Sequence, residues 1–190
     1  MNVKKIALFA SGSGTNAQNI MEYFSDSKHI MIDSVWSNKA DAYVLTRARE
    51  MAVNTFTFSR HQFYETQEIA DILTERNIDL IVLAGFLWLV PENLIEKFKI
   101  INIHPSLLPK YGGKGMYGMK VHQAVLENNE TETGISIHVV NPHYDEGKLL
   151  FQAKCPVLPE DSPQDIAKRV HQLEYIHFPE VIEKFLLEKI

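Results

Sequence analysis

The sequence predicts an α/β fold with an open, mostly parallel twisted sheet, helices on both faces of the sheet, and antiparallel strands near the C-terminus. Short apolar runs alternate with longer amphipathic stretches through the first hundred residues, which is typical of repeated strand–helix–strand units. The run at residues 79–84 (DLIVLA) is almost entirely apolar, as expected for a central strand covered on both faces. The length of 190 residues, with 45% hydrophobic and 23% charged, predicts a single domain spanning residues 1–190.

The first half contains five predicted strands and four predicted helices. Helix 63–76 places acidic residues on one side and Ile69, Ile72 and Leu73 on the other. Pro91 suits the first turn of the fourth helix. The predicted strands are residues 5–10, 31–36, 55–58, 79–84 and 100–103, and the predicted helices are residues 17–24, 40–51, 63–76 and 91–98.

The second half is richer in glycine and proline. Four of the nine glycines fall within residues 112–118, and six of the eight prolines fall within residues 105–163. Residues 105–118 are therefore predicted to form a long loop, a kind of segment that often carries function. The remaining predictions are a helix at residues 118–128, strands at 135–140 and 149–153, and a final helix at 163–188.

Composition excludes several classes of protein. The net charge of −5 disfavours nonspecific nucleic-acid binding, and the apolar run at residues 80–90 is far shorter than the roughly 20 residues of a membrane span. The apolar stretch at residues 6–10, which follows two lysines, is too short for a signal peptide. The single Cys155 and the absence of a Cys/His cluster predict no metal site and a cytoplasmic location.

A glycine-containing segment, Gly12, Ser13, Gly14, Thr15 and Asn16, follows the first predicted strand. Its glycines allow close approach of an anion, and the N-terminus of the next helix attracts negative charge. The pattern formally fits a dinucleotide site, but that site needs an acidic residue near the end of the second strand, and Asp33 lies inside that strand, two or three residues too early. A monophosphate site is therefore favoured over one for NAD. The alternative is a tight turn in which Thr15 caps the helix.

Two further polar segments follow predicted strands. Asn102 and His104 lie two residues apart on a strand, so their side chains point the same way and can supply an oxyanion donor and a proton carrier. Asp145, in a turn after strand 135–140, can orient a histidine. His138 lies opposite the apolar face of that strand and is placed at the cleft, whereas His122 and His171 are interpreted as surface or packing residues.

The chain resembles the formyltransferase family that uses 10-formyltetrahydrofolate. The similarity covers nearly the whole chain, through SGSGTN, SNKADA, LAGF, INIHPSLLP and GISIHVV followed by DEG. The resemblance implies a Rossmann-like formyltransferase fold. It also implies transfer of the formyl group of 10-formyltetrahydrofolate, a cosubstrate, to the amine of glycinamide ribonucleotide in purine biosynthesis, without a metal.

The resemblance assigns roles to individual residues. Asn102, His104 and Asp145 match the catalytic trio, which stabilises a tetrahedral oxyanion, with Asp145 keeping His104 cationic. The residues that match the family's binding site for the ribonucleotide phosphate and ribose are Gly12, Ser13, Gly14, Thr15, Asn16 and Glu174. The residues that match the family's folate-binding site are Leu87, Trp88, Leu89, Val90, Asn102, Asn141 and Tyr144.

Other functions remain open at this point. A hydrolase of the same folate would use the same trio, but such relatives carry an additional N-terminal domain for which this chain is expected to have no room. The tRNA-modifying relatives carry an additional C-terminal domain, and a noncatalytic nucleotide-binding module rests only on the glycine pattern. The expected partners are small molecules and neither nucleic acid nor a membrane, and the protein is expected to be a monomer or a homodimer.

Overall fold

The computed structural model describes residues 3–190, which form a seven-stranded sheet with the strand order β3-β2-β1-β4-β5-β6-β7. Strands β1 to β5 are parallel, whereas β6 is antiparallel to β5, and β7 to β6. This arrangement confirms the predicted fold class. The strands are β1 (Lys4–Phe9), β2 (Ile30–Ser37), β3 (Asn54–Thr57), β4 (Leu80–Leu83), β5 (Lys99–His104), β6 (Glu132–Val139) and β7 (Leu149–Pro156).

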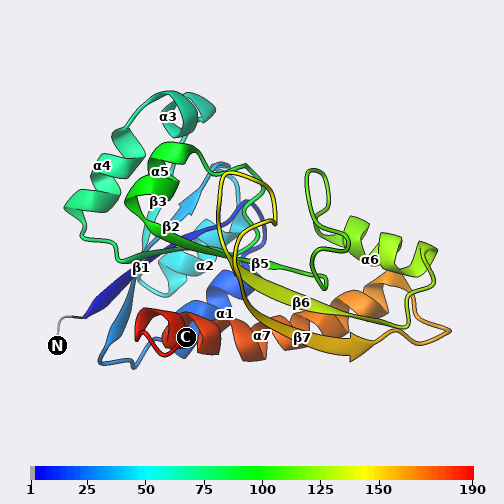
Figure 1. Ribbon diagram of the computed structural model, residues 1–190. Coiled ribbons are helices and arrows are strands. Elements are labelled where there is room, and N and C mark those ends of the chain that lie inside the picture. The colour runs from blue at the N-terminus through cyan, green and yellow to red at the C-terminus, as the bar shows by residue number, and fades with distance from the viewer. Residues whose placement is uncertain (1–2) are drawn as a thin grey trace.

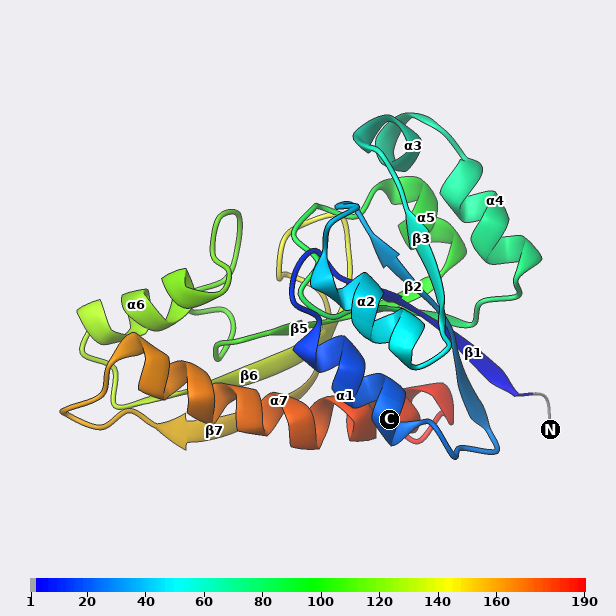
Figure 2. The ribbon, with the colours of Figure 1, turned by 180° about the vertical axis from the view of Figure 1, so that it is seen from behind.

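Helices cover both faces of the sheet (Figures 1 and 2). One face carries α1 (Thr15–Tyr23), α2 (Tyr43–Glu50) and α7 (Pro163–Leu186), and the other carries α3 (Arg60–Glu65), α4 (Glu68–Glu75) and α5 (Glu92–Lys97). Helix α6 (Met119–Glu127) packs against α7.

The two layers bury separate apolar clusters, because successive side chains of a strand point to opposite faces. On β1, Ile6 and Leu8 belong to the cluster beneath α1, α2 and α7, and Ala7 and Phe9 belong to the cluster beneath α3, α4 and α5. The central strands are thus buried on both faces, as their continuous apolar sequence predicted.

The predicted helix at residues 63–76 is wrong, because the structure has two helices there, α3 and α4. Residue Thr66 between them is extended, and its hydroxyl donates to the Gln62 carbonyl. A hydroxyl that bonds to nearby backbone in this way competes with helix continuation. Helix α3 also begins earlier than predicted, with a capping box in which Ser59 and Gln62 bond each other's backbone, a local signal that the apolar periodicity overlooked.

The strand order reverses at β1 and β4, and in open α/β sheets ligands bind beyond the carboxyl ends of the strands at such a reversal. The segments after β1, β4 and β5 therefore meet at one edge of the sheet. The predicted loop at residues 105–118 contains no helix or strand and lies at this edge. No helix within residues 3–190 is both long enough and apolar enough to cross a membrane.

Candidate active site

A cleft of about 470 Å³ lies at the carboxyl edge of the sheet, and every site residue predicted from the sequence lines it. The cleft brings together segments that are far apart in the chain, after β1, β4, β5 and β6, with α7 along one side. These lining residues are Gly12, Ser13, Gly14, Thr15, Asn16, Leu87, Trp88, Leu89, Val90, Asn102, His104, Asn141, Tyr144, Asp145 and Glu174.

The glycine-containing segment forms the N-terminus of α1. Gly14 is the residue before the helix and has φ of 74°, a conformation that favours glycine. A Cβ at Gly14 would lie 2.3 Å from the Val44 side chain, so the residue also allows α2 to approach. Thr15 is the first helical residue and Gly14 makes no side-chain cap, so the alternative in which Thr15 caps the helix is wrong. The first N–H groups of α1 therefore have no side-chain acceptor from a capping residue and point to where an anion can bind.

Residues 34–40, which contain the end of β2, include no carboxylate that could bind a dinucleotide ribose. The nearest candidate, Asp33, lies within the strand and is 7% exposed. Its two carboxylate oxygens accept hydrogen bonds from the Arg76 guanidinium, at 2.6 Å and 3.2 Å. At the strand end, Asn38 instead accepts a hydrogen bond from Ser11, which ties this turn to the first segment. These contacts disfavour the dinucleotide interpretation.

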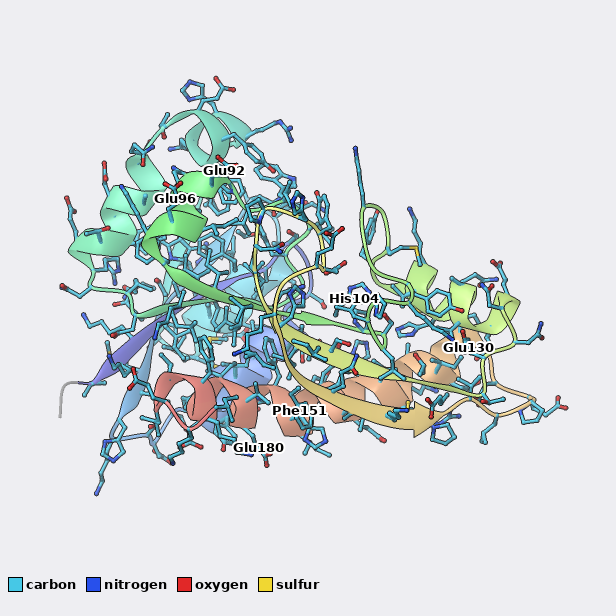
Figure 3. All side chains as sticks on the ribbon, in the orientation of Figure 1. Glu92, Glu96, His104, Glu130, Phe151 and Glu180 are labelled. Carbon is cyan, nitrogen blue, oxygen red and sulfur yellow. The ribbon has the colours of Figure 1, made fainter. Side chains whose placement is uncertain are left out.

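Strands β5 and β6 and the loop after β6 bring four polar side chains together. Asn102 lies directly opposite His138 in the antiparallel pair, and its Nδ2 lies 3.2 Å from His138 Nε2 and 3.4 Å from Asp145 Oδ1. His104 Nδ1 lies 3.5 Å from Asp145 Oδ2. The prediction that His138 faces the cleft is confirmed. Figure 3 shows His104 between the loop after β6 and the segment that leads into α6.

The protonation of His104 follows from its surroundings. Its Nε2 lies 2.7 Å from the Tyr111 carbonyl oxygen, which can only accept, so Nε2 carries a proton and Nδ1 faces Asp145. The side chain is 5% exposed, and burial lowers the pKa of His104 below its usual 6.5 although Asp145 acts to raise it. Burial therefore opposes the imidazolium, whereas the acceptors that face both ring nitrogens favour it, and the expectation that Asp145 keeps His104 cationic stays a prediction.

Asp145 is held as a carboxylate. Burial acts to raise its pKa, but hydrogen bonding from His138, the nearby His104 and the Gly113 N–H together lower it. Asp145 adopts φ of 57°, which places the carboxylate between the two histidines at the cost of local strain. A carboxylate in this position can stabilise an imidazolium that forms transiently.

A further wall of the cleft, formed after β4, is apolar and aromatic. Leu87, Leu89 and Val90 line it after β4, and Trp88 packs against the rings of Phe63 and Tyr64. This wall suits a flat heterocycle, whereas the α1 end suits an anion. Within residues 3–190, no three His, Cys, Asp or Glu side chains are grouped so as to hold a metal ion.

Among the lining residues that the sequence did not predict are two histidines on helices. His122, on α6, is 2% exposed, and its Nδ1 has no hydrogen-bond partner among the described residues. His171, on α7, has its Nδ1 2.7 Å from Glu174 Oε2 and belongs to the cleft rather than to an outer surface. Both residues lie on helices without a motif, and only the packing of α6 and α7 along the cleft brings them to it.

A mostly parallel α/β sheet whose carboxyl edge carries an imidazole, a carboxylate, a glycine-containing helix N-terminus and an aromatic wall in one cleft defines an enzyme that acts on small molecules. The chain belongs to the formyl transferase family, whose model matches residues 4–182.

Individual relatives agree with this assignment. The chain is 40% identical to phosphoribosylglycinamide formyltransferase of Haemophilus influenzae over 96% of this chain and 87% of that protein. It is 37% identical to the enzyme of that name from Escherichia coli over 95% of this chain and 86% of that protein. Its structure is similar to that of glycinamide ribonucleotide transformylase 1 from Symbiobacterium toebii, with a TM-score of 0.88, 32% identity and coverage of 98% of this chain and 89% of that chain.

Proposed function

We propose that this chain transfers the formyl group of 10-formyltetrahydrofolate to the amine of glycinamide ribonucleotide, a step of purine biosynthesis. The observation that supports the proposal is that Asn102, His104 and Asp145 contact one another in a cleft that is also lined by a glycine-containing helix N-terminus and by an aromatic wall. The helix N-terminus suits a ribonucleotide phosphate, and the aromatic wall suits a pterin. A formyl group and an amine bound at these two places would meet at the trio.

The trio fits the charges of such a transfer. When the amine attacks the formyl carbon, its oxygen becomes negative, and the Asn102 amide is positioned to donate to it by exchanging one of its long contacts. His104 lies beside this charge and relays a proton from the attacking amine to the leaving nitrogen. Asp145 stabilises the intervening imidazolium across 3.5 Å.

We also propose which residues bind each of the two substrates. Gly12, Ser13, Gly14, Thr15 and Asn16 hold the ribonucleotide phosphate, and Glu174 lies near its ribose. The residues that hold the folate are Leu87, Trp88, Leu89, Val90, Asn102, Asn141 and Tyr144. We further propose that residues 1–190 form one domain, that the protein is a monomer or a homodimer, and that it works in the cytoplasm without a metal.

An absorbance assay with a 10-formyl folate analogue tests the function. Purified protein is incubated with the analogue in the presence and in the absence of glycinamide ribonucleotide. Deformylation that requires the ribonucleotide is the expected result. Deformylation at the same rate without it would replace the proposal with the hydrolase, and no reaction in either case would contradict both.

A further inference from the structure

The acidic side chain at the ribonucleotide end of the cleft presents an electrostatic problem. Glu174 is 4% exposed, and its Oε2 accepts a hydrogen bond of 2.8 Å from Asn16 Nδ2. Asn16 lies in the first turn of α1, where the proposed function places a phosphate. A carboxylate at this helix N-terminus competes with the phosphate for the positive potential of α1, and its negative charge repels the phosphate.

His171 is placed to remove that repulsion. Its Nδ1 lies 2.7 Å from the same Oε2 of Glu174, so Asn16, Glu174 and His171 form one hydrogen-bonded chain from α1 to α7. The His171 side chain is 47% exposed, and it lines the cleft. A proton can therefore reach it from solvent while its partner stays buried.

We infer that His171 is a positioning residue whose protonated form cancels the charge of Glu174 beside the glycine-lined segment, so that the ribonucleotide phosphate binds more tightly to this form. The inference rests on the proposed function for the identity of the ligand. It extends that function because it gives the phosphate site a dependence on pH that its backbone N–H groups cannot provide.

The titratable groups around His171 agree with this role. On its own helix, hydrogen bonding to Glu174 raises the pKa of His171 above its usual 6.5, and the Tyr175 ring stacks beside it. From α6, His122 faces the pair, and burial lowers its pKa to about 4, so it stays neutral. From α1, Asn16 is uncharged. His171 is therefore the group in this cluster that gains or loses a charge near and above pH 6.5.

The test compares the KM for glycinamide ribonucleotide between pH 6.5 and 9 in the wild type, in His171→Gln and in His171→Lys. We expect the wild-type KM to rise by about tenfold as His171 loses its proton. His171→Gln should show the higher value throughout, and His171→Lys the lower value over most of the range. Ratios of variant to wild type cancel the titration of the substrate's own phosphate and amine, and kcat at saturation should change by less than about twofold.

His177→Gln is the matched control. His177 lies on the same helix and approaches Glu180 with the same three-residue spacing, at 4.0 Å, but it is not among the residues that line the cleft. This variant should follow the wild-type pH profile. A parallel KM profile for the wild type and His171→Gln would overturn the inference.

A binding measurement separates this inference from the proposed function. Calorimetric titration with ribose 5-phosphate requires no formyl transfer, and we expect its affinity to fall with pH in the wild type but not in His171→Gln. If the wild type shows this difference without catalysing transfer, the proposed function fails and the inference stands. Equal affinities in the two proteins, or no binding to either, would overturn the inference even if transfer occurs.

Discussion

Two glycines in the segment after β1 have different structural roles. Gly14 combines a positive φ with close contact to α2, whereas a Cβ on Gly12 would have nothing within 4 Å. Both residues were predicted to belong to the same anion site, because sequence spacing carries no information about which glycine a neighbouring helix approaches.

We expect Gly14→Ala to lower the free energy of unfolding by about 3 kcal/mol, because the left-handed conformation and the contact with Val44 both oppose a Cβ. Gly12→Ala, the matched control, should change it by less than about 1 kcal/mol. Urea denaturation of the two variants checks the difference. Equal losses of unfolding free energy in Gly14→Ala and Gly12→Ala would contradict the different roles of the two glycines.

The residues at strand ends were predictable from the sequence because their geometry is local. Asn102 and His104 share a side of one strand through its two-residue period, and the parallel strand order brings the segment after β1 to the same edge. The surroundings of His104 were not predictable, since its burial and its contact with the Tyr111 carbonyl depend on how the 105–118 loop folds. No pattern of residue types reveals that burial.

At the scale of elements, the 105–118 loop positions the carboxylate. The Gly113 N–H donates to Asp145 Oδ2 at 2.9 Å, and a Cβ on Gly112 would lie 3.3 Å from Asp145 Cβ. The same Cβ would meet the Leu108 side chain at 2.6 Å, which a flexible side chain can relieve. The loop thus acts as a template for Asp145, while α6 and α7 supply the opposite wall with residues that lack any motif.

Gly112→Ala should therefore reduce kcat by about tenfold, because a shift of a fraction of an ångström in Asp145 disturbs its alignment with His104. The fold should stay intact, since Gly112 does not have a positive φ. Lys114→Ala, an exposed change in the same loop, is the control and should leave kcat unchanged. Steady-state kinetics and circular dichroism of the two variants test the claim, and an unaltered kcat in Gly112→Ala would contradict it.

At the scale of the whole molecule, burial of neutral histidines links stability to pH. His122 is 2% exposed, and burial lowers its pKa from 6.5 to about 4. The unfolded chain therefore binds a proton more readily than the folded one in this window. The stability contributed by His122 is complete above pH 6.5 and is lost as the pH falls towards 4.

We expect the free energy of unfolding to fall between pH 7.5 and 5, and His122 should contribute up to about 2 kcal/mol of this fall. His122→Asn should have a shallower pH dependence, whatever its absolute stability. His29→Asn, an exposed change, should keep the wild-type slope. Urea denaturation across this range measures all three, and an unchanged slope in His122→Asn would show that the histidine is not held neutral.

The central claim is that His104 carries the proton during formyl transfer, and single-turnover transfer by His104→Ala tests it most directly. Calorimetry with each substrate separately establishes that this variant still binds both. The account predicts binding close to that of the wild type and a transfer rate lower by at least about a hundredfold. A folded His104→Ala variant that transfers the formyl group at nearly the wild-type rate would contradict the account.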